Sequence, residues 1–178
     1  MLHKIKQAVD FIKSKTDFEP EYGVILGTGL GALADEIDLV VEIDYKDIPH
    51  FPLSTIEFHS GKLIFGYLEG KPVVTMKGRF HFYEGYNMKE VTFPVRVLKL
   101  LGIKKLFVSN AAGSLNPNYD LSDLMIINDH INLQMENPLV GESLDELGDR
   151  FPDMSEPYDL ELVSRGLKIA KKNKIPTH

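Results

Sequence analysis

The sequence predicts an α/β protein, because segments with the periodicity of strands alternate with segments with the periodicity of helices along much of the chain. Two of the predicted strands end in turns of glycine or other small residues, at 27–31 and 109–113. Ligands of open α/β sheets bind beyond the carboxyl ends of the strands, so these turns are candidate binding loops. The length of 178 residues suggests a single domain over 1–178 with a sizeable core.

The first part of the chain predicts a helix, two strands and a loop. Apolar residues recur at helical spacing and predict a helix over about 2–15. A short apolar run at 24–26 predicts a buried strand, which a glycine-rich turn and a short helix follow. Residues 39–45 predict a second strand, and prolines and a glycine mark 47–61 as a loop.

The middle of the chain predicts a hairpin and a helix. Residues 62–82 are typical of a hairpin that turns at Glu69-Gly70-Lys71. Apolar residues then recur at helical spacing over 88–101, and Gly102 supplies the C-terminal stop. Pro94 lies inside this pattern and predicts either a kink or a late helix start.

The last part predicts two strands, a long loop and a helix. Residues 104–113 predict a buried strand with a small-residue turn, and 123–133 predict another strand. A polar loop follows over 134–157, and 158–173 has the pattern of an amphipathic helix. Because a helix at this point of an α/β chain normally leads back into a strand, we expect a fold that is cut short at the C-terminus.

Composition narrows the class of function. The net charge of −6 argues against a broad nucleic-acid surface, so any anion site must be local. The absence of cysteine excludes disulfides and thiolate chemistry, and the six histidines lack the spacing of an HExxH metal motif. We therefore expect no metal site. Neither a signal peptide nor a membrane-spanning segment is indicated, so we expect a cytoplasmic protein.

The stretch GRFHFYEGY alternates polar and apolar side chains. An extended strand would place Arg79, His81 and Tyr83 on one face and Phe80 and Phe82 on the other. The polar face could be a ligand-binding face, and the two phenylalanines would anchor the strand in the core. An edge strand with a polar outer face is the alternative.

The stretch LGTGLGA lies directly after a predicted strand. Glycines in that position let backbone N–H groups converge on an anion such as phosphate. Gly27, Gly29 and Ala32 also fit a dinucleotide fingerprint, with Glu42 or Asp44 as its acidic residue. Only about six residues fit between this turn and the next strand, whereas a crossover needs roughly a dozen or more. A phosphate site, a dinucleotide site and a purely structural turn all stay open.

Other polar residues carry weaker signals. Arg79 offers a bidentate fork that matches phosphate. His59 lies in a predicted loop and is either part of the same crevice or simply exposed. His130, in a predicted strand, is interpreted as a structural histidine. Glu84 and Asp129 lack the spacing that would indicate a two-carboxylate hydrolase.

Several motifs together resemble the trimeric purine nucleoside phosphorylases. The motifs, in the family's order and spacing, are GVILGTGLG, HSGKLIFGYLEGKPVVTMKGRFHFYEGY, VTFPVRVLKLLG, SNAAGSLNP, DLMIINDHINL, NPL.G and GDRFPDMS..YD. They cover about residues 22–160. The related methylthioadenosine phosphorylases resemble the chain at GTGLG but less well at GRFHFYEGY and GDRFPDMS.

The resemblance implies a nucleoside phosphorylase-like fold, with a mixed central sheet flanked by helices, and a homotrimer. It implies reversible phosphorolysis of purine ribonucleosides or deoxyribonucleosides to the free purine and a pentose 1-phosphate, as in purine salvage. Phosphate is then a co-substrate, and neither a cofactor nor a metal is implied.

The resemblance also implies roles for particular residues. Thr28, Arg79, His81, His59 and the Ala111 amide match phosphate ligands, and His81 and His59 are the implied catalytic residues. Tyr83 and Phe151 match ribose contacts, and Phe151 would reach a neighbouring subunit.

The family's purine-reading carboxylate and asparagine, a second phosphate hydroxyl and a ribose-facing histidine have no counterpart in this sequence. We therefore expect the 178-residue chain alone to have little activity. Two alternatives stay open: a dinucleotide-dependent oxidoreductase built on GTGLGA, and a non-catalytic phosphate-binding fragment.

Overall fold

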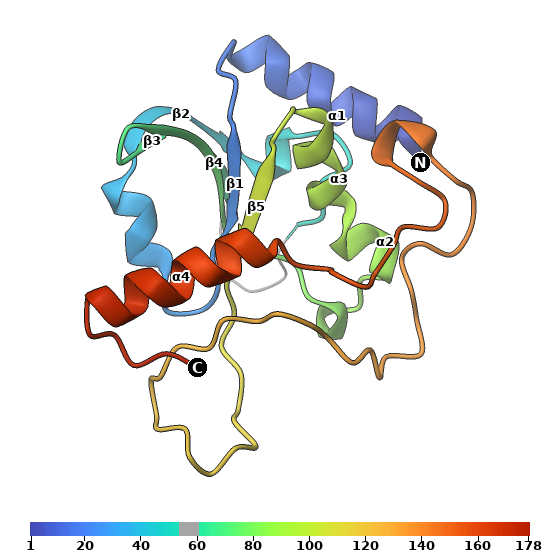
Figure 1. The fold of residues 1–178 in the computed structure, drawn as a ribbon. Coiled ribbons are helices and arrows are strands. Elements are labelled where there is room, and N and C mark those ends of the chain that lie inside the picture. Colours follow the sequence, from blue (N-terminus) through green and yellow to red (C-terminus); the bar gives the residue numbers. More distant parts are fainter. Residues whose placement is uncertain (54–60) are drawn as a thin grey trace. The chain divides into compact units, whose positions relative to one another are not determined.

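A computed structural model describes residues 1–53 and 61–178 (Figure 1). The chain divides into two compact units, each of which is described by itself. Unit 1 comprises Met1–Ala111 and Glu136–Leu147, and unit 2 comprises Ala112–Met135 and Gly148–His178. The single domain expected over 1–178 stays a prediction.

Unit 1 is built on a five-stranded mixed sheet with the order β2-β3-β4-β1-β5. Its strands are β1 (Tyr22–Ile25), β2 (Asp38–Asp44), β3 (Lys62–Leu68), β4 (Lys71–Lys77) and β5 (Lys105–Val108). The antiparallel hairpin of β3 and β4 turns at Glu69 and Gly70, as predicted. β1 lies parallel to both β4 and β5. The carboxyl ends of these three strands therefore meet at one edge of the sheet.

Two helices cover one face of the sheet. α1 (Leu2–Lys15) and α3 (Phe93–Leu100) share a hydrophobic core with strand residues such as Phe65 and Val74. Helical spacing explains the packing of α1, because its buried positions lie on one stripe; they are Ile5, Ala8, Val9 and Ile12. The predicted helix over 88–101 is interrupted at Thr92, between α2 (Met88–Val91) and α3, which begins one residue before Pro94. The opposite face holds a smaller core that includes η1, a 3₁₀ helix at Gly31–Glu36.

The predicted strand over Arg79–Tyr83 is wrong. β4 ends at Lys77, Gly78 turns the chain with a φ of 103°, and a 3₁₀ helix, η3, covers Phe82–Glu84. Phe80 is buried as expected, but Phe82 is 49% exposed and anchors nothing in the core. The left-handed turn at Gly78 redirects the backbone before a strand can continue.

Two further strand predictions need correction. β5 is not a buried strand: Phe107 and Val108 are 46% and 60% exposed, because β5 lies at the edge of the described sheet. Residues 123–133 form no strand beyond an isolated bridge between Leu124 and Thr177. A strand-like sequence pattern is therefore not enough to form a strand, because a strand also needs a neighbouring strand with which it exchanges hydrogen bonds.

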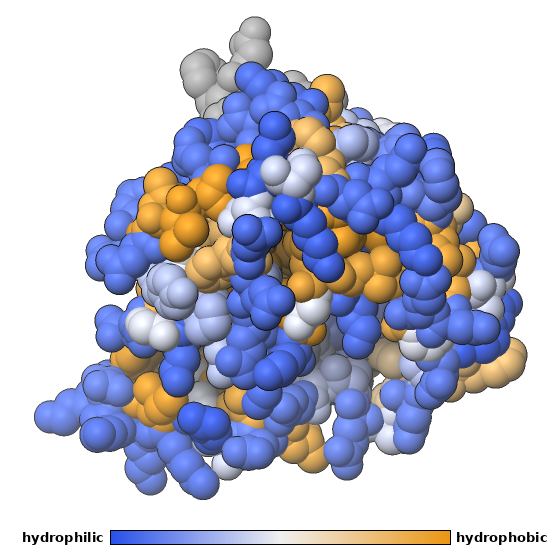
Figure 2. Space-filling view, turned by 90° about the horizontal axis from the view of Figure 1, so that it is seen from above, coloured by the Kyte–Doolittle hydropathy of each residue, from blue (hydrophilic) through white to orange (hydrophobic). Residues whose placement is uncertain are grey.

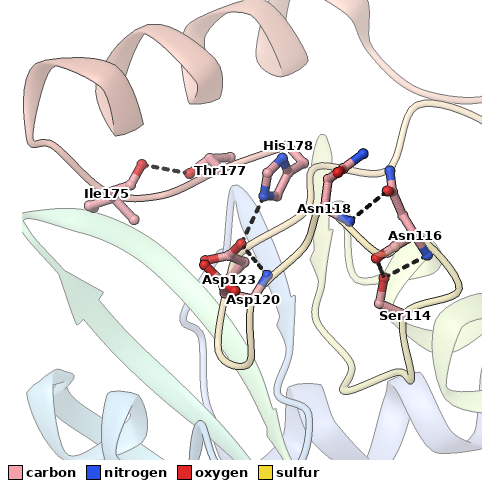
Figure 3. A network of polar contacts seen from close by, with 8 residues as sticks. All are labelled: Ser114, Asn116, Asn118, Asp120, Asp123, Ile175, Thr177 and His178. Atoms are coloured by element: carbon pink, nitrogen blue, oxygen red, sulfur yellow. Dashed lines mark hydrogen bonds and ion pairs between the residues drawn. The ribbon is translucent and has the colours of Figure 1, made fainter.

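Unit 2 combines long loops with the predicted last helix, α4 (Leu160–Lys172), which begins after an Asp159 side-chain cap. Polar contacts within the loop over 114–123 involve Ser114, Asn116 and Asn118, and Asp123 connects this loop to His178 (Figure 3). Asp123 accepts a hydrogen bond from the Asp120 amide at 2.9 Å and pairs with His178 at 2.8 Å. The predicted structural role of His130 agrees with its contact to the Tyr158 hydroxyl.

The face shown in Figure 2 carries mostly hydrophilic side chains, with hydrophobic ones in separate groups. Within the described part of the chain, no helix is both long enough and apolar enough to cross a membrane.

Tyr45 fixes the turn that precedes Arg79. Its ring lies 5.2 Å from that of Phe80 and 5.4 Å from that of Phe51, measured between centroids. Its hydroxyl donates a 2.8 Å hydrogen bond to the Gly78 carbonyl. Burial raises the pKa of the Tyr45 phenol well above its ordinary value. The hairpin end is thereby tied to the aromatic core.

We expect Tyr45→Phe to lower the free energy of unfolding by about 1 kcal/mol at pH 7, because it removes one neutral hydrogen bond. The unfolded chain releases the phenolic proton above about pH 10, whereas the buried phenol keeps it. Stability linked to Tyr45 is therefore present below about pH 10 and lost as the pH rises.

The difference in unfolding free energy between the two proteins should accordingly shrink above about pH 10, in urea titrations compared with pH 7. Tyr83→Phe is the control, because the Tyr83 side chain is 75% exposed. A difference that grows with pH would contradict the burial of an un-ionised phenol.

Candidate functional site

The candidate site lies at the carboxyl ends of three neighbouring parallel strands in unit 1. Because β4, β1 and β5 run in the same direction, the segments that follow them emerge at one edge. These segments are the glycine loop after β1, the turn with Arg79 after β4, and Ser109–Ala111 after β5. Three stretches distant in sequence are thereby placed next to one another.

The glycine loop approaches the end of β5 closely. The Gly27 amide donates to Ser109 Oγ at 2.9 Å, and a Cβ on Gly27 would lie 2.5 Å from the Ser109 carbonyl oxygen. Gly29 has a φ of 87°, which favours glycine. Thr28 is exposed between them, and neither its hydroxyl nor the amides of Thr28 and Gly29 have a hydrogen-bond partner among the described residues. The Thr28 hydroxyl and both amides can therefore donate hydrogen bonds to an anion.

Arg79 crosses the end of β1 to reach β5. Its Nη1 donates to the Ser109 carbonyl at 2.8 Å, and its Nε donates to His81 Nε2 at 3.0 Å. The side chain is half-buried. Two of its N–H groups therefore fix the orientation of the guanidinium, and the remaining ones, which have no hydrogen-bond partner among residues 1–53 and 61–178, can donate to a ligand.

Glu84 holds His81 in one tautomer. Its carboxylate is 2% exposed and lies 2.6 Å from His81 Nδ1 and 2.9 Å from the His81 amide nitrogen. Because Arg79 Nε always carries a hydrogen, His81 Nε2 must accept it. The ring proton therefore lies on Nδ1 and is donated to Glu84.

The other predicted site residues are placed as follows. The Tyr83 ring stacks on His81 with centroids 4.7 Å apart and is otherwise largely exposed. Ala111 is exposed at the end of the segment after β5. Phe151 belongs to unit 2, where it is 87% exposed. His59 lies outside the described residues.

Sequence reasoning missed two residues of this site. Glu84 was considered only as a hydrolase carboxylate, although its position three residues after His81 is the spacing of the capping box that the structure shows. Ser109 was treated as one of several small residues in a turn. Its bond to Gly27 spans 82 positions, and no local pattern indicates it.

The geometry does not fit the dinucleotide alternative. A dinucleotide fold needs a helix that returns to a strand beside β1. Here the glycine loop leads into the short 3₁₀ helix η1, and β2 pairs with β3 at the far edge of the sheet. In the part of the chain that the structure describes, no cluster of three or more potential metal ligands occurs.

Comparison with known proteins identifies the family of this chain. The family model of the phosphorylase superfamily matches residues 21–178. The chain is 54% identical over 176 residues to purine nucleoside phosphorylase 1 of Bacillus subtilis, covering 99% of this chain and 65% of that protein. It therefore spans less than two-thirds of the length of this relative.

Two solved structures are also similar. A purine nucleoside phosphorylase in complex with ribose-1-phosphate matches with a TM-score of 0.93 and 44% identity, over 99% of this chain and 67% of that one. A schistosoma purine nucleoside phosphorylase in complex with hypoxanthine has the same TM-score and identity, over 99% of this chain and 64% of that one. Fold and sequence agree, and the chain belongs to the phosphorylase superfamily.

Proposed function

We infer that the protein containing this chain catalyses the reversible phosphorolysis of purine nucleosides, with phosphate bound at the carboxyl ends of β4, β1 and β5. The observation that carries this proposal is the Arg79 side chain, which Ser109 and His81 hold beside the open glycine loop. The similar proteins that bind ribose-1-phosphate and hypoxanthine support the substrate class.

The proposed phosphate ligands are Thr28, Arg79, His81 and the Ala111 amide, with His59 added from the family resemblance. A guanidinium and a hydroxyl supply strong donors in a protein whose net charge is −6. Local donors of this kind are what an anion site in an acidic protein needs. Inorganic phosphate is then a co-substrate, and no metal is part of the proposal.

Phosphate in this position has a catalytic role as well as a nucleophilic one. Breaking the glycosidic bond develops positive charge on the sugar, and a fixed phosphate dianion beneath the ring stabilises that charge. Phosphate oxygen then forms the new bond to the anomeric carbon, while the purine leaves with the bonding electrons. Preorganised ligands lower the barrier because phosphate needs no reorientation.

Contact between His81 and phosphate requires that one of the two donates a hydrogen bond. His81 Nε2 accepts from Arg79 Nε, and the ring hydrogen lies on Nδ1 beside Glu84. The monohydrogen phosphate dianion carries one hydroxyl, which can take the place of Arg79 Nε as the donor to His81 Nε2. Glu84 supports this contact, because its carboxylate keeps the hydrogen on Nδ1 and leaves Nε2 as the acceptor.

The proposal extends to the sugar and the assembly. Tyr83, stacked beside His81, is the proposed ribose contact in unit 1, and Phe151 is proposed to contact ribose in a neighbouring subunit. A homotrimer and a cytoplasmic location stay predictions.

Release of hypoxanthine from inosine by the intact protein tests the function. We expect release that depends on phosphate and is unchanged by added NAD. Release without phosphate, or dependence on NAD, would contradict phosphorolysis.

The Arg79→Ala substitution should weaken phosphate binding by roughly 1.5–3 kcal/mol, the range for a hydrogen bond to a charged group. Calorimetric titration with inorganic phosphate measures this. Arg165→Ala is the matched control, because Arg165 lies on the exposed side of α4 and is 63% exposed in its side chain. Equal phosphate affinities of the two variants would remove Arg79 from the site.

The Glu84→Gln substitution should reduce phosphate affinity about tenfold, since it weakens the hydrogen bonds that hold the His81 ring and backbone. Calorimetric titration with inorganic phosphate measures this change. Glu90→Gln is the control, because Glu90 caps α2 through the Asn87 amide. Equal loss of affinity in both variants, or unchanged affinity in Glu84→Gln, would argue against the His81 contact.

A further inference from the structure

We propose that Ser109 is a positioning residue, whose hydroxyl and carbonyl set the geometry of the phosphate ligands without contacting phosphate through the side chain. The proposal rests on the proposed function, since it assigns a role within the same site. Ser109 contacts both the glycine loop and Arg79, and it is the first residue of the segment Ser109–Ala111.

The Ser109 side chain extends the pairing of two strands. The ladder between β1 and β5 ends with Ile25 opposite Val108. Beyond that pair, Ser109 Oγ accepts from the Gly27 amide at 2.9 Å and donates to the Ile25 carbonyl at 3.2 Å. The Ser109 amide donates to the same carbonyl at 3.0 Å. The hydroxyl thus ties the start of the glycine loop to the start of the turn after β5.

The absence of a side chain on Gly27 makes this contact tight. A Cβ there would lie 2.5 Å from the Ser109 carbonyl oxygen and 2.9 Å from the Asn110 Cα, distances that force the backbone to shift. The hydroxyl also occupies the Gly27 N–H, which therefore is not offered to a ligand. The next two amides of the loop, those of Thr28 and Gly29, have no hydrogen-bond partner in the described part of the chain.

The Ser109 carbonyl orients the guanidinium. It accepts from Arg79 Nη1 at 2.8 Å, while Arg79 Nε is held by His81. A fork with two fixed N–H groups presents the others in one direction only. Ser109 contacts both the glycine loop and the Arg79 guanidinium. The spacing between the Thr28 hydroxyl and that guanidinium therefore depends on Ser109.

A purely structural hydroxyl would behave differently. Its loss would leave the Gly27 amide without a partner and lower stability, but folded molecules would still bind phosphate normally. A positioning hydroxyl also changes the affinity of the folded protein. Phosphate affinity, measured separately from stability, therefore distinguishes the two roles.

The test is calorimetric titration of three variants with inorganic phosphate, beside their thermal unfolding. We expect Ser109→Ala to weaken phosphate binding about three- to tenfold, the range for one neutral hydrogen bond. Ser109→Thr keeps the hydroxyl and should restore most of the affinity. Ser14→Ala, which removes an exposed hydroxyl on α1, should bind like the unaltered protein.

The possible results distinguish the proposed function from the positioning role of Ser109. No phosphate binding by the unaltered protein would overturn the proposed function and this inference with it. Normal phosphate binding by the unaltered protein and by Ser109→Ala would overturn the positioning role alone, even if Ser109→Ala were less stable. Equal loss in the alanine and threonine variants would likewise exclude the hydroxyl as the cause.

A measurement without substitution covers the case in which Ser109→Ala does not fold. In amide hydrogen exchange followed by NMR, the Gly27 amide should be protected with or without phosphate. The Thr28 and Gly29 amides should exchange fast and become protected when phosphate is added. Fast exchange at Gly27 in the phosphate-free protein would contradict the bond to Ser109.

Discussion

The parallel pairing of β1 with both β4 and β5 is the constraint on which the candidate site depends. It brings to one edge of the sheet three chain segments that start at positions 27, 78 and 109. The side chains of these segments lie near one another, because the backbone has already brought the segments to the same edge. The antiparallel strands β2 and β3 complete the sheet and its core without contributing described residues to the site.

Close backbone approach is the second requirement of this edge. Gly27 leaves room for the Ser109 backbone, and Gly78 turns the chain after β4 with a positive φ. The Tyr45 hydroxyl fixes that turn from the core side. Arg79 and His81 are then held by hydrogen bonds to a carbonyl, to each other and to a nearly buried carboxylate. A cationic site is thus built from few residues in a protein with a net charge of −6.

The part of the fold that follows from local patterns was predictable. Helical spacing predicts α1 within its observed bounds, and Glu69-Gly70 predicts the hairpin turn. The alternation in GRFHFYEGY was misleading, because a strand and a turn with a 3₁₀ helix are equally compatible with it. Arg79, His81 and Tyr83 nevertheless come together, since η3 stacks Tyr83 on His81. Ser109 could not be identified, because its partner Gly27 is adjacent only after the sheet has formed.

The proposed function requires that phosphate binds where β4, β1 and β5 end. A crystal structure grown with phosphate and without sulfate tests it most directly. We expect a tetrahedral anion that contacts the Thr28 hydroxyl, the Arg79 guanidinium and the Ala111 amide, with the hydrogen bond from Gly27 to Ser109 intact. Phosphate bound at another edge of the sheet, or a site that stays empty at saturating phosphate, would contradict it.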